Sequence, residues 1–205
     1  MRLLMIGAPG AGKGTQAARI ADHFGLVHIS SGDLLRSHVK RGTAIGRAAR
    51  SYLDRGDLVP DAVVLDMLRK PVVEAAAADG YVLDGFPRTV GQAEQAYDVA
   101  AQLGISVQLA LHLQVARAEL VARLVARGVS TGRTDDTPEV VEHRLDLYEE
   151  QTRPILEYYA QRERLLEVNG DRPVDEVTWS AIVQLQRAQR ALNTDGGKQA
   201  GKPRS

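Results

Sequence analysis

The amino-acid sequence predicts an α/β fold, a three-layer sandwich in which a five-stranded parallel sheet lies between two layers of helices. Short apolar runs alternate along the chain with longer segments of helical periodicity, which is the order expected of parallel strands joined by helices. The first apolar run leads directly into a glycine-rich segment, residues 7–15. The chain has 205 residues, of which 44% are hydrophobic, and this is enough for one core with small inserted lobes.

The strands are predicted from short apolar runs that stop at glycine or at a polar residue. Leu3 to Ile6 is apolar throughout, which suits a parallel strand that is buried on both faces. The same reasoning applies further along the chain. The other predicted strands are residues 26–30, 81–86, 107–113 and 164–170.

Helices are predicted where apolar residues recur at helical spacing between capping or stop residues. The first begins at Lys13 and is expected to stop at Gly25, and Thr43 is the expected N-cap of the third. Pro71 and Pro154 are expected to bend or divide their helices, because proline lacks a backbone N–H. The predicted helices are residues 13–24, 32–42, 43–56, 61–78, 89–103, 116–127, 139–162 and 174–191.

Two stretches interrupt the alternation of strands and helices. Residues 30–59 place two helices between the second and third strands, and residues 128–137 form a polar segment with two glycines. Ligands of open parallel sheets bind beyond the carboxyl ends of the strands. Both stretches are therefore predicted to cover a site, the first as a small helical lobe and the second as a short lid. The core domain then comprises residues 1–29, 60–127 and 138–192.

The composition excludes several classes of partner and site. The 26 basic and 26 acidic residues balance, so neither a nucleic acid nor a membrane is an expected partner. There is no cysteine, hence no disulfide and no thiolate zinc site. No apolar run is long enough to span a membrane, and the N-terminus lacks the pattern of a signal peptide, so a cytoplasmic protein is expected. Residues 193–205 contain no large apolar residue and are predicted to be a disordered tail.

The segment "GAPGAGKGT", residues 7–15, resembles a phosphate-binding loop (P-loop). Gly7, Gly12 and Lys13 satisfy the pattern G-x-x-x-x-G-K-[ST], in which backbone N–H groups and a lysine hold phosphate oxygens. The pattern then requires a hydroxyl, but Gly14 stands there and Thr15 comes one place late. A variant P-loop between an apolar strand and a helix is the interpretation that this context favours.

Charged residues that suit phosphate chemistry occur in two further places. The strand in "YVLDGFPRT" ends at Asp84, which resembles a carboxylate directed at Mg²⁺ or its waters, and Arg88 follows. Four more arginines flank the polar segment. A guanidinium group can bind two phosphate oxygens at once and remains charged at any working pH, so such a cluster suits phosphoryl transfer. These arginines are Arg123, Arg127, Arg133 and Arg144.

In combination these motifs resemble the adenylate kinases, a family of nucleoside monophosphate kinases, in their short-lid form. The resemblance covers residues 1–192 and rests on "GAPGAGKGTQ", "ISSGDLLR", "GDLVPD", "LDGFPRT" with Gln92, and "RGVSTGRTDDTPEVVEHR". Many members have threonine where this chain has Ser31. The resemblance implies a core domain, an AMP-binding lobe and a lid over ATP. It also implies the reversible reaction of MgATP with AMP to give two ADP. We expect the protein to be a monomer.

The resemblance also implies which residues act. The ATP-binding residues would be Gly10, Ala11, Gly12, Lys13, Gly14, Thr15, Arg127 and Gly170. The AMP-binding residues would be Ser31, Arg36, Asp57, Leu58, Val59, Gly85, Phe86, Pro87, Arg88, Gln92, Arg133 and Arg144. The catalytic set would be Lys13, Asp84, Arg88, Arg123, Arg127, Arg133 and Arg144. Mg²⁺ would be held through phosphates and waters near Asp84 and Asp33, with no direct protein ligand and no structural zinc.

Two alternatives remain open. A UMP or CMP kinase would share the P-loop and most of the arginines, although "DGFPRT" and Gln92 favour adenine. A P-loop protein that uses a nucleotide as a switch, without phosphoryl transfer, is the alternative from another class. It would need a region that changes with the bound nucleotide, and no segment resembles one.

Overall fold

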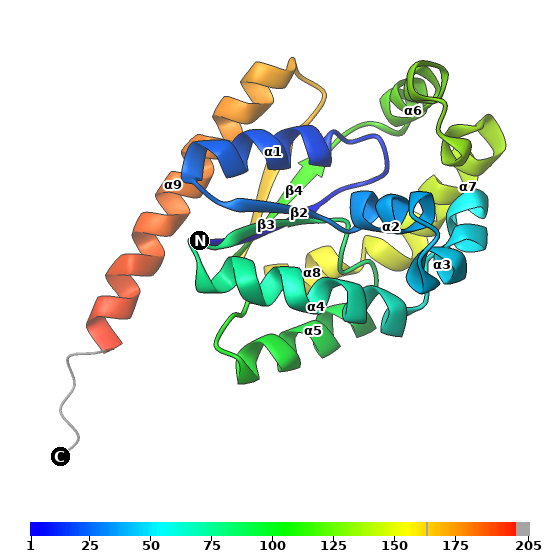
Figure 1. Cartoon of the computed structure of the whole chain (residues 1–205). Coiled ribbons are helices and arrows are strands. Elements are labelled where there is room, and N and C mark those ends of the chain that lie inside the picture. Colours follow the sequence, from blue (N-terminus) through cyan, green and yellow to red (C-terminus); the bar gives the residue numbers. More distant parts are fainter. Residues whose placement is uncertain (163, 200–205) are drawn as a thin grey trace.

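The fold is built on a five-stranded parallel sheet with the strand order β2-β3-β1-β4-β5 (Figure 1). The structure is a computed structural model, and it describes residues 1–162 and 164–199. All four pairings between neighbouring strands are parallel, as predicted. The strands are β1 (Arg2–Ile6), β2 (Val27–Ser30), β3 (Tyr81–Asp84), β4 (Leu109–Gln114) and β5 (Leu165–Asn169).

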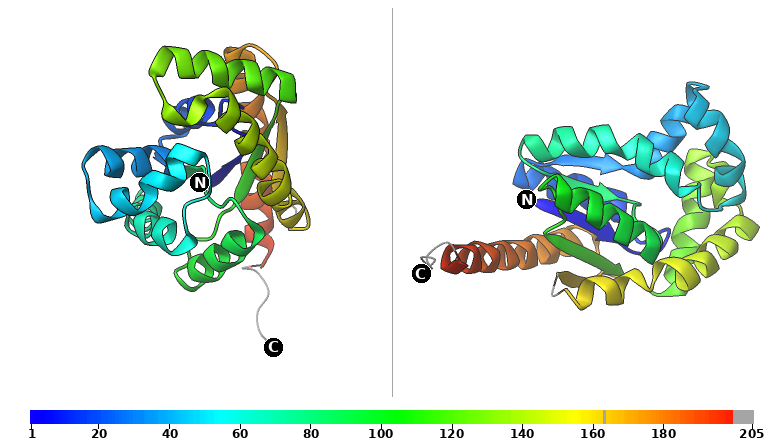
Figure 2. Two further views of the ribbon diagram at one scale, coloured as in Figure 1. Left: turned by 90° about the vertical axis from the view of Figure 1, so that its right-hand side faces the viewer. Right: turned by 90° about the horizontal axis from the view of Figure 1, so that it is seen from below.

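Helices cover both faces of this sheet, as Figures 1 and 2 show. The α-helices are α1 (Lys13–Phe24), α2 (Ser31–Lys40), α3 (Ala44–Arg55), α4 (Asp61–Ala77), α5 (Val90–Gln102), α6 (Arg117–Thr131), α7 (Pro138–Leu147), α8 (Ile155–Ala160) and α9 (Val174–Gln199). A 3-10 turn, Thr134–Asp136, and a π-helical turn, Tyr148–Thr152, complete the described elements.

The alternation of side chains along each strand creates two cores, one on each face of the sheet. In β1, Leu3 and Met5 face the core under α1, α6, α7 and α9, whereas Leu4 and Ile6 face the core under α4, α5 and α8. Because both faces are covered, a parallel strand reads as a continuous apolar run. This explains why the strands could be recognised in the sequence.

The helical lobe consists of α2 and α3, which pack closely against each other. Gly46 allows this packing, because a Cβ atom at that position would lie 2.1 Å from the carbonyl oxygen of His38. Both helices have hydroxyl N-caps, from Ser30 and from the predicted Thr43. The lobe and the α6–α7 segment stand at the same end of the sheet in Figures 1 and 2, beyond the carboxyl ends of the strands.

Several predicted element boundaries differ from the structure for identifiable reasons. Strand β3 stops at Asp84, because Gly85 has a positive φ of 81° and leaves the strand conformation. The first part of the segment predicted as a lid loop is helical as far as Thr131, because Gly132, with a positive φ of 64°, forms the C-cap of α6, and Gly128 leaves room for Asp136. The single helix predicted for 139–162 is divided into α7, the π-helical turn and α8 near Pro154.

The prediction of a disordered tail from residue 193 is wrong for residues 193–199. Helix α9 continues to Gln199, although its last residue packed against the core is Ala188. Extending an existing helix costs much less free energy than nucleating a new one, so a helix can continue beyond its last apolar contact. Residues 200–205 of the predicted tail lie outside the described residues. Within the described part of the chain, no helix has the length and apolar character needed to cross a membrane.

The close packing of the lobe leads to a prediction for two glycine variants. Gly46→Ala should lower the free energy of unfolding by about 2 kcal/mol, because the new methyl group overlaps the backbone of α2. Gly91→Ala is the matched control, since Gly91 lies in α5 and a Cβ atom there would lie 4.0 Å from Thr89 Oγ1, an ordinary van der Waals distance. It should leave stability unchanged or raise it by up to about 1 kcal/mol. Urea unfolding followed by far-ultraviolet circular dichroism measures both, and equal stabilities would contradict the packing.

Candidate functional site

The P-loop lies between β1 and α1, the position predicted from the sequence. Gly10 and Gly12 have positive φ values of 84° and 88°, which side chains other than glycine rarely adopt. Gly12 forms the N-cap of α1 without a side-chain cap, so backbone N–H groups remain directed at the loop. A helix N-terminus with free N–H groups favours a phosphate group at this point.

Lys13 folds back over the loop that precedes it. Its ammonium group donates hydrogen bonds to the carbonyl oxygens of Gly7 and Ala8, at 2.8 and 3.0 Å. Burial lowers the pKa of Lys13 to about 8. The Asp84 carboxylate opposes this change, whereas the nearby arginines add to it. A nearby anion would raise the pKa of this buried lysine again, because a negative charge stabilises its protonated form.

Asp84 lies opposite the position where the common P-loop pattern has its hydroxyl. In the sheet register Asp84 of β3 is the partner of Met5 in β1, which ends at the P-loop. A Cβ atom on Gly14 would lie 3.6 Å from Asp84 Oδ2, so the carboxylate faces the hydroxyl-free position directly. The buried Asp84 Oδ1 has no hydrogen-bond partner among the described residues. A carboxylate oxygen of this kind fits the hydration shell of a divalent cation.

Arg88 is held by the loop that follows β3. Its Nε donates to the carbonyl of Gly85 at 2.8 Å, and its backbone N–H donates to Gln92 Oε1 at 2.7 Å. Burial lowers the pKa of Arg88, and the charge of Arg144 lowers it further, while Asp84 acts in the opposite direction. Two guanidinium groups from distant parts of the sequence therefore lie within electrostatic reach of each other. The Phe86–Pro87 peptide bond in this loop is cis.

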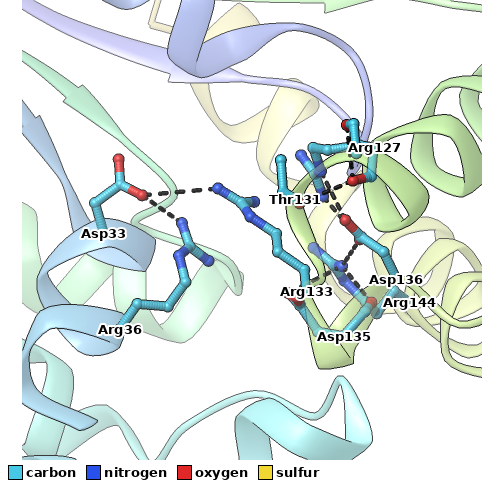
Figure 3. A network of polar contacts seen from close by, with 9 residues as sticks. Asp33, Arg36, Arg127, Thr131, Arg133, Asp135, Asp136 and Arg144 are labelled. Carbon is cyan, nitrogen blue, oxygen red and sulfur yellow. Dashed lines mark hydrogen bonds and ion pairs between the residues drawn. The ribbon is translucent and has the colours of Figure 1, made fainter. Parts of the chain in front are cut away.

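Asp136 joins two of the predicted arginines, as Figure 3 shows. Its fully buried carboxylate accepts two hydrogen bonds from Arg127, at 2.7 and 2.8 Å, and one from Arg144 at 2.8 Å. Arg144 also donates to the carbonyl oxygen of Asp135 at 2.7 Å. Burial alone would raise the pKa of Asp136, but the hydrogen bond and charge of Arg127 outweigh it and hold that pKa below its usual value.

The remaining predicted arginines occupy two different surroundings. Arg133 reaches from the lid towards the lobe, where its guanidinium lies 4.0 Å from Asp33 Oδ1, and the same carboxylate oxygen accepts a hydrogen bond from Arg36 (Figure 3). Arg123 does not join this network. It binds Glu119 and the carbonyl oxygen of Gly170, the latter at 3.0 Å. Asp33 is thus paired with two guanidinium groups.

The other residues predicted on the lobe side gather around two small adjoining pockets. One pocket, of about 80 Å³, contains Lys13, Arg88 and Arg144 in its lining. The second, of about 20 Å³, contains Ser31 and Gln92. Arg88 lines both. The two pockets also share Leu58 and Gly85, and the second is lined by Asp57, Val59 and Phe86 as well, whereas Pro87 lines the first.

Two polar side chains in the second pocket have contrasting surroundings. The buried Ser31 Oγ has no hydrogen-bond partner in the described part of the chain, and it lies so close to Gly85 that a Cβ there would be 2.5 Å away. The Gln92 amide is already occupied, since it accepts from the Arg88 N–H and donates to Asp61 Oδ1 at 2.5 Å. Ser31 is therefore free to bind a ligand, and Gln92 has one remaining amide hydrogen.

A larger groove, of about 490 Å³, lies between α4 and α5, but its chemistry differs from that of the P-loop region. Its lining is mostly apolar, with Leu65, Val72 and Tyr97 among the residues, and it lacks the cluster of cations. Phosphate binding requires converging cations and N–H groups. The smaller pockets beside Lys13 are therefore the candidate site.

Sequence reasoning missed three residues of the site. Asp135 and Asp136 were quoted only as part of a motif, and their ion pairs with Arg144 follow from a fold-back between α6 and α7. Thr152 donates a hydrogen bond to the carbonyl oxygen of Arg88 from a π-helical turn. The two adjacent aspartates beside Arg133 were a usable signal, because buried arginines need acidic partners. No local pattern indicated Thr152.

The position of Asp136 between two arginines leads to a stability prediction. Asp136→Asn should lower the free energy of unfolding by about 2 to 3 kcal/mol at neutral pH, because it removes the buried counterion of Arg127 and leaves Arg144 with Asp135 alone. Asp146→Asn, which removes an exposed partner of Arg117, is the control and should cost less than about 0.5 kcal/mol.

The same pair of variants gives a dependence on pH. The folded-state pKa of Asp136 is lowered, so its stabilising contribution is present above about pH 4 and is lost as the pH falls through the folded-state value. The difference between the natural chain and Asp136→Asn should therefore shrink in acid. Urea unfolding at pH 7 and pH 3.5 tests this, and a cost no larger than that of Asp146→Asn would contradict the network.

Comparisons with known proteins place the chain in a family. The family model described as adenylate kinase matches residues 5–164. An adenylate kinase of Kocuria rhizophila is 44% identical over 186 residues, which are 91% of this chain and 99% of the relative. One from Micrococcus luteus is 46% identical over 177 residues, 86% of each chain.

A third relative differs in length. The adenylate kinase of Lachnospira eligens is 40% identical over 212 residues, which take in 90% of this chain and 99% of that relative. That alignment is longer than this chain of 205 residues, so the relative contains residues that this chain lacks. Because the family model matches most of the chain and these relatives are 40 to 46% identical over most of its length, the chain belongs to the adenylate kinase family and is a phosphotransferase, a kinase.

Proposed function

We propose that the protein transfers the terminal phosphoryl group of MgATP to AMP, reversibly, to give two ADP. The main support for this proposal is that two adjoining pockets are lined by neighbouring cations and share Arg88. Lys13 and Arg144 line the pocket beside the P-loop, and Arg88 lines both that pocket and the one in front of the lobe. A site with two adjoining anion pockets suits a donor and an acceptor that each carry phosphate.

On the donor side, the P-loop holds the ATP phosphates in this proposal. Backbone N–H groups and Lys13 bind their oxygens, and Arg127 and Arg123 lie on the same side. Gly170 would contact the adenine through its backbone, after Arg123 releases the carbonyl oxygen that it binds here. The proposed ATP-binding residues are Gly10, Ala11, Gly12, Lys13, Gly14, Thr15, Arg127 and Gly170.

On the acceptor side, the lobe holds AMP. The unpartnered Ser31 hydroxyl and the one free amide hydrogen of Gln92 are the groups available for new hydrogen bonds. Arg36, Arg88, Arg133 and Arg144 supply positive charge for the phosphate. The proposed AMP-binding residues also include Asp57, Leu58, Val59, Gly85, Phe86 and Pro87.

The chemistry needs alignment and charge neutralisation more than proton transfer. The second pKa of a phosphate monoester is about 6, so the attacking oxygen of AMP is already ionised at neutral pH and requires no general base. Lys13, Arg88 and Arg144 stabilise the charge on the group in transit. Asp136 contributes by holding Arg127 and Arg144 in place, although it does not itself touch phosphate in this proposal.

Mg²⁺ would enter with ATP and be held through phosphate oxygens and through waters near Asp84. The unpartnered Asp84 Oδ1 and the hydroxyl-free Gly14 beside it support this arrangement. When bound, the ion neutralises charge on the phosphates. Asp33 would help less, because Arg36 and Arg133 already share its carboxylate. We propose no structural zinc, since the chain has no cysteine.

Closure of the lobe and lid would exclude water, which competes with AMP for the phosphoryl group. The two pockets, about 80 and 20 Å³, are well below the several hundred Å³ of a typical ligand site, so the lobe must move outward to admit a nucleotide. His143 of α7 and Asp57 of the lobe meet at 2.8 Å, and this contact would open with it. We further propose that the protein acts as a monomer in the cytoplasm.

The acceptor is the first point to test. AMP, UMP, CMP and GMP are tested in separate assays, at equal concentrations and with the same MgATP. ADP should form at least tenfold faster with AMP than with any other monophosphate, because Gln92 favours adenine in this proposal. Coupled detection of ADP measures these rates. A preference for UMP or CMP would assign the chain to that alternative specificity, and absence of transfer to every acceptor would favour a nucleotide switch.

Proton uptake tests the proposed role of Lys13. Its pKa is about 8 in the free protein, and bound phosphate should raise it, so ATP binding at pH 8 should take up protons. The affinity for ATP should therefore fall as the pH rises through 8. Calorimetry in two buffers of different ionisation enthalpy measures the uptake, with Lys13→Met as the control in which it should disappear. Equal uptake by both proteins would place the titrating group elsewhere.

A further inference from the structure

The π-helical turn Tyr148–Thr152 stands between the helix that carries Arg144 and the core helix α8. Its hydrogen bond from the N–H of Arg153 to the carbonyl oxygen of Tyr148, 2.8 Å long, joins residues five apart instead of the usual four. Turns of this type are frequent at functional sites. The turn also borders the candidate site, since Tyr148 and Thr152 line the same pocket as Lys13.

The Thr152 hydroxyl makes an unusual contact for a threonine in a helix. Thr131, Thr178 and Thr194 each donate to the carbonyl oxygen four residues earlier in their own helix, all at 2.8 Å. Thr152 instead donates across the site to the carbonyl oxygen of Arg88, also at 2.8 Å and partly buried. The carbonyl oxygen four residues before Thr152 is that of Tyr148, which already accepts from Arg153.

This hydrogen bond joins the backbone of Arg88 to the π-helical turn that follows α7, the helix that carries Arg144. Burial lowers the pKa of Arg88, and the charge of Arg144 lowers it further, because the two positive groups lie near each other. Two guanidinium groups have no acceptor atom, so their side chains cannot hold each other in place. A backbone contact that holds the loop of Arg88 against the segment after α7 therefore acts against this repulsion.

We propose that Thr152 is a positioning residue that sets the spacing of Arg88 and Arg144 around the phosphoryl group in transit. The inference rests on the proposed transfer between ATP and AMP. Thr152 does not touch a phosphate itself; it acts through the backbone of Arg88. Misplacement of a charged group matters more for the transition state than for the bound substrates, so the loss should fall on kcat.

The test compares three variants of the full chain. Thr152→Val keeps the shape and removes the hydroxyl, whereas Thr152→Ser keeps the hydroxyl. Thr194→Val removes a matched hydroxyl near the end of α9, away from the site. We expect Thr152→Val to lower kcat about tenfold with both KM values within about twofold, Thr152→Ser to recover most of the rate, and Thr194→Val to match the natural chain.

A second measurement separates positioning from a general structural role. Arg144→Lys removes one of the two guanidinium groups whose spacing Thr152 is proposed to set. In that variant, Thr152→Val should lower kcat by less than threefold, because both substitutions disturb the same spacing. Should Thr152→Val fail to fold, Thr152→Ala takes its place with the same expected results. Fully additive losses, or a rise in KM at unchanged kcat, would overturn the proposal.

The outcomes also distinguish this inference from the function on which it rests. If the natural chain transfers no phosphoryl group from ATP to AMP, the proposed function fails. If the natural chain is active and Thr152→Val is equally active, the proposed function stands and the positioning role of Thr152 is refuted.

Discussion

Cations buried beside one another are the constraint at the centre of this molecule. Lys13, Arg88, Arg127 and Arg144 converge from four different segments; burial lowers the pKa of Lys13 most, and the nearby arginines lower it further. The structure opposes the repulsion between these cations with carboxylates, those of Asp84, Asp135 and the fully buried Asp136. Two features of the surrounding structure hold these cations in place. A fold-back between α6 and α7 brings Asp136 to Arg127 and Arg144, and Thr152 of the π-helical turn donates a hydrogen bond to the carbonyl oxygen of Arg88. Bound nucleotides would complete the balance, because their phosphates supply the missing negative charge.

The same constraint explains why the lobe and lid already approach each other. Two polar contacts connect the lobe to the segment from Arg133 to α7: Arg133 lies 4.0 Å from Asp33 Oδ1, and His143 Nε2 lies 2.8 Å from Asp57 Oδ1. Gly56 permits the approach, since a Cβ atom there would lie 2.7 Å from the side chain of Arg144. Contacts between partly exposed polar groups are weak and easily exchanged for water. They can therefore hold a nearly closed arrangement while still releasing the lobe when a nucleotide must enter or leave.

Most of the fold, and the position of the site, could be predicted from local patterns. The five strands are apolar runs with both faces covered, and the P-loop and Asp84 stand at strand ends, where sequence order alone places them together. What escaped prediction depends on contacts between distant segments. The packing of Asp136 against Gly128 joins the two sides of the segment between α6 and α7, and the contact of Thr152 with Arg88 accompanies a local change of helical register. Periodicity does not report such contacts, because they arise only when the chain has folded.

The central claim is that the cations are held together at a cost in stability that phosphate binding relieves. The most direct test is the free energy of unfolding of the natural chain and of Lys13→Met, each measured by urea denaturation with and without saturating MgATP and AMP. Without nucleotides, removing one cation should leave the variant at least as stable as the natural chain. With nucleotides, the natural chain should gain several kcal/mol and the variant much less. A variant that is less stable than the natural chain by about 2 kcal/mol or more without nucleotides would contradict the claim.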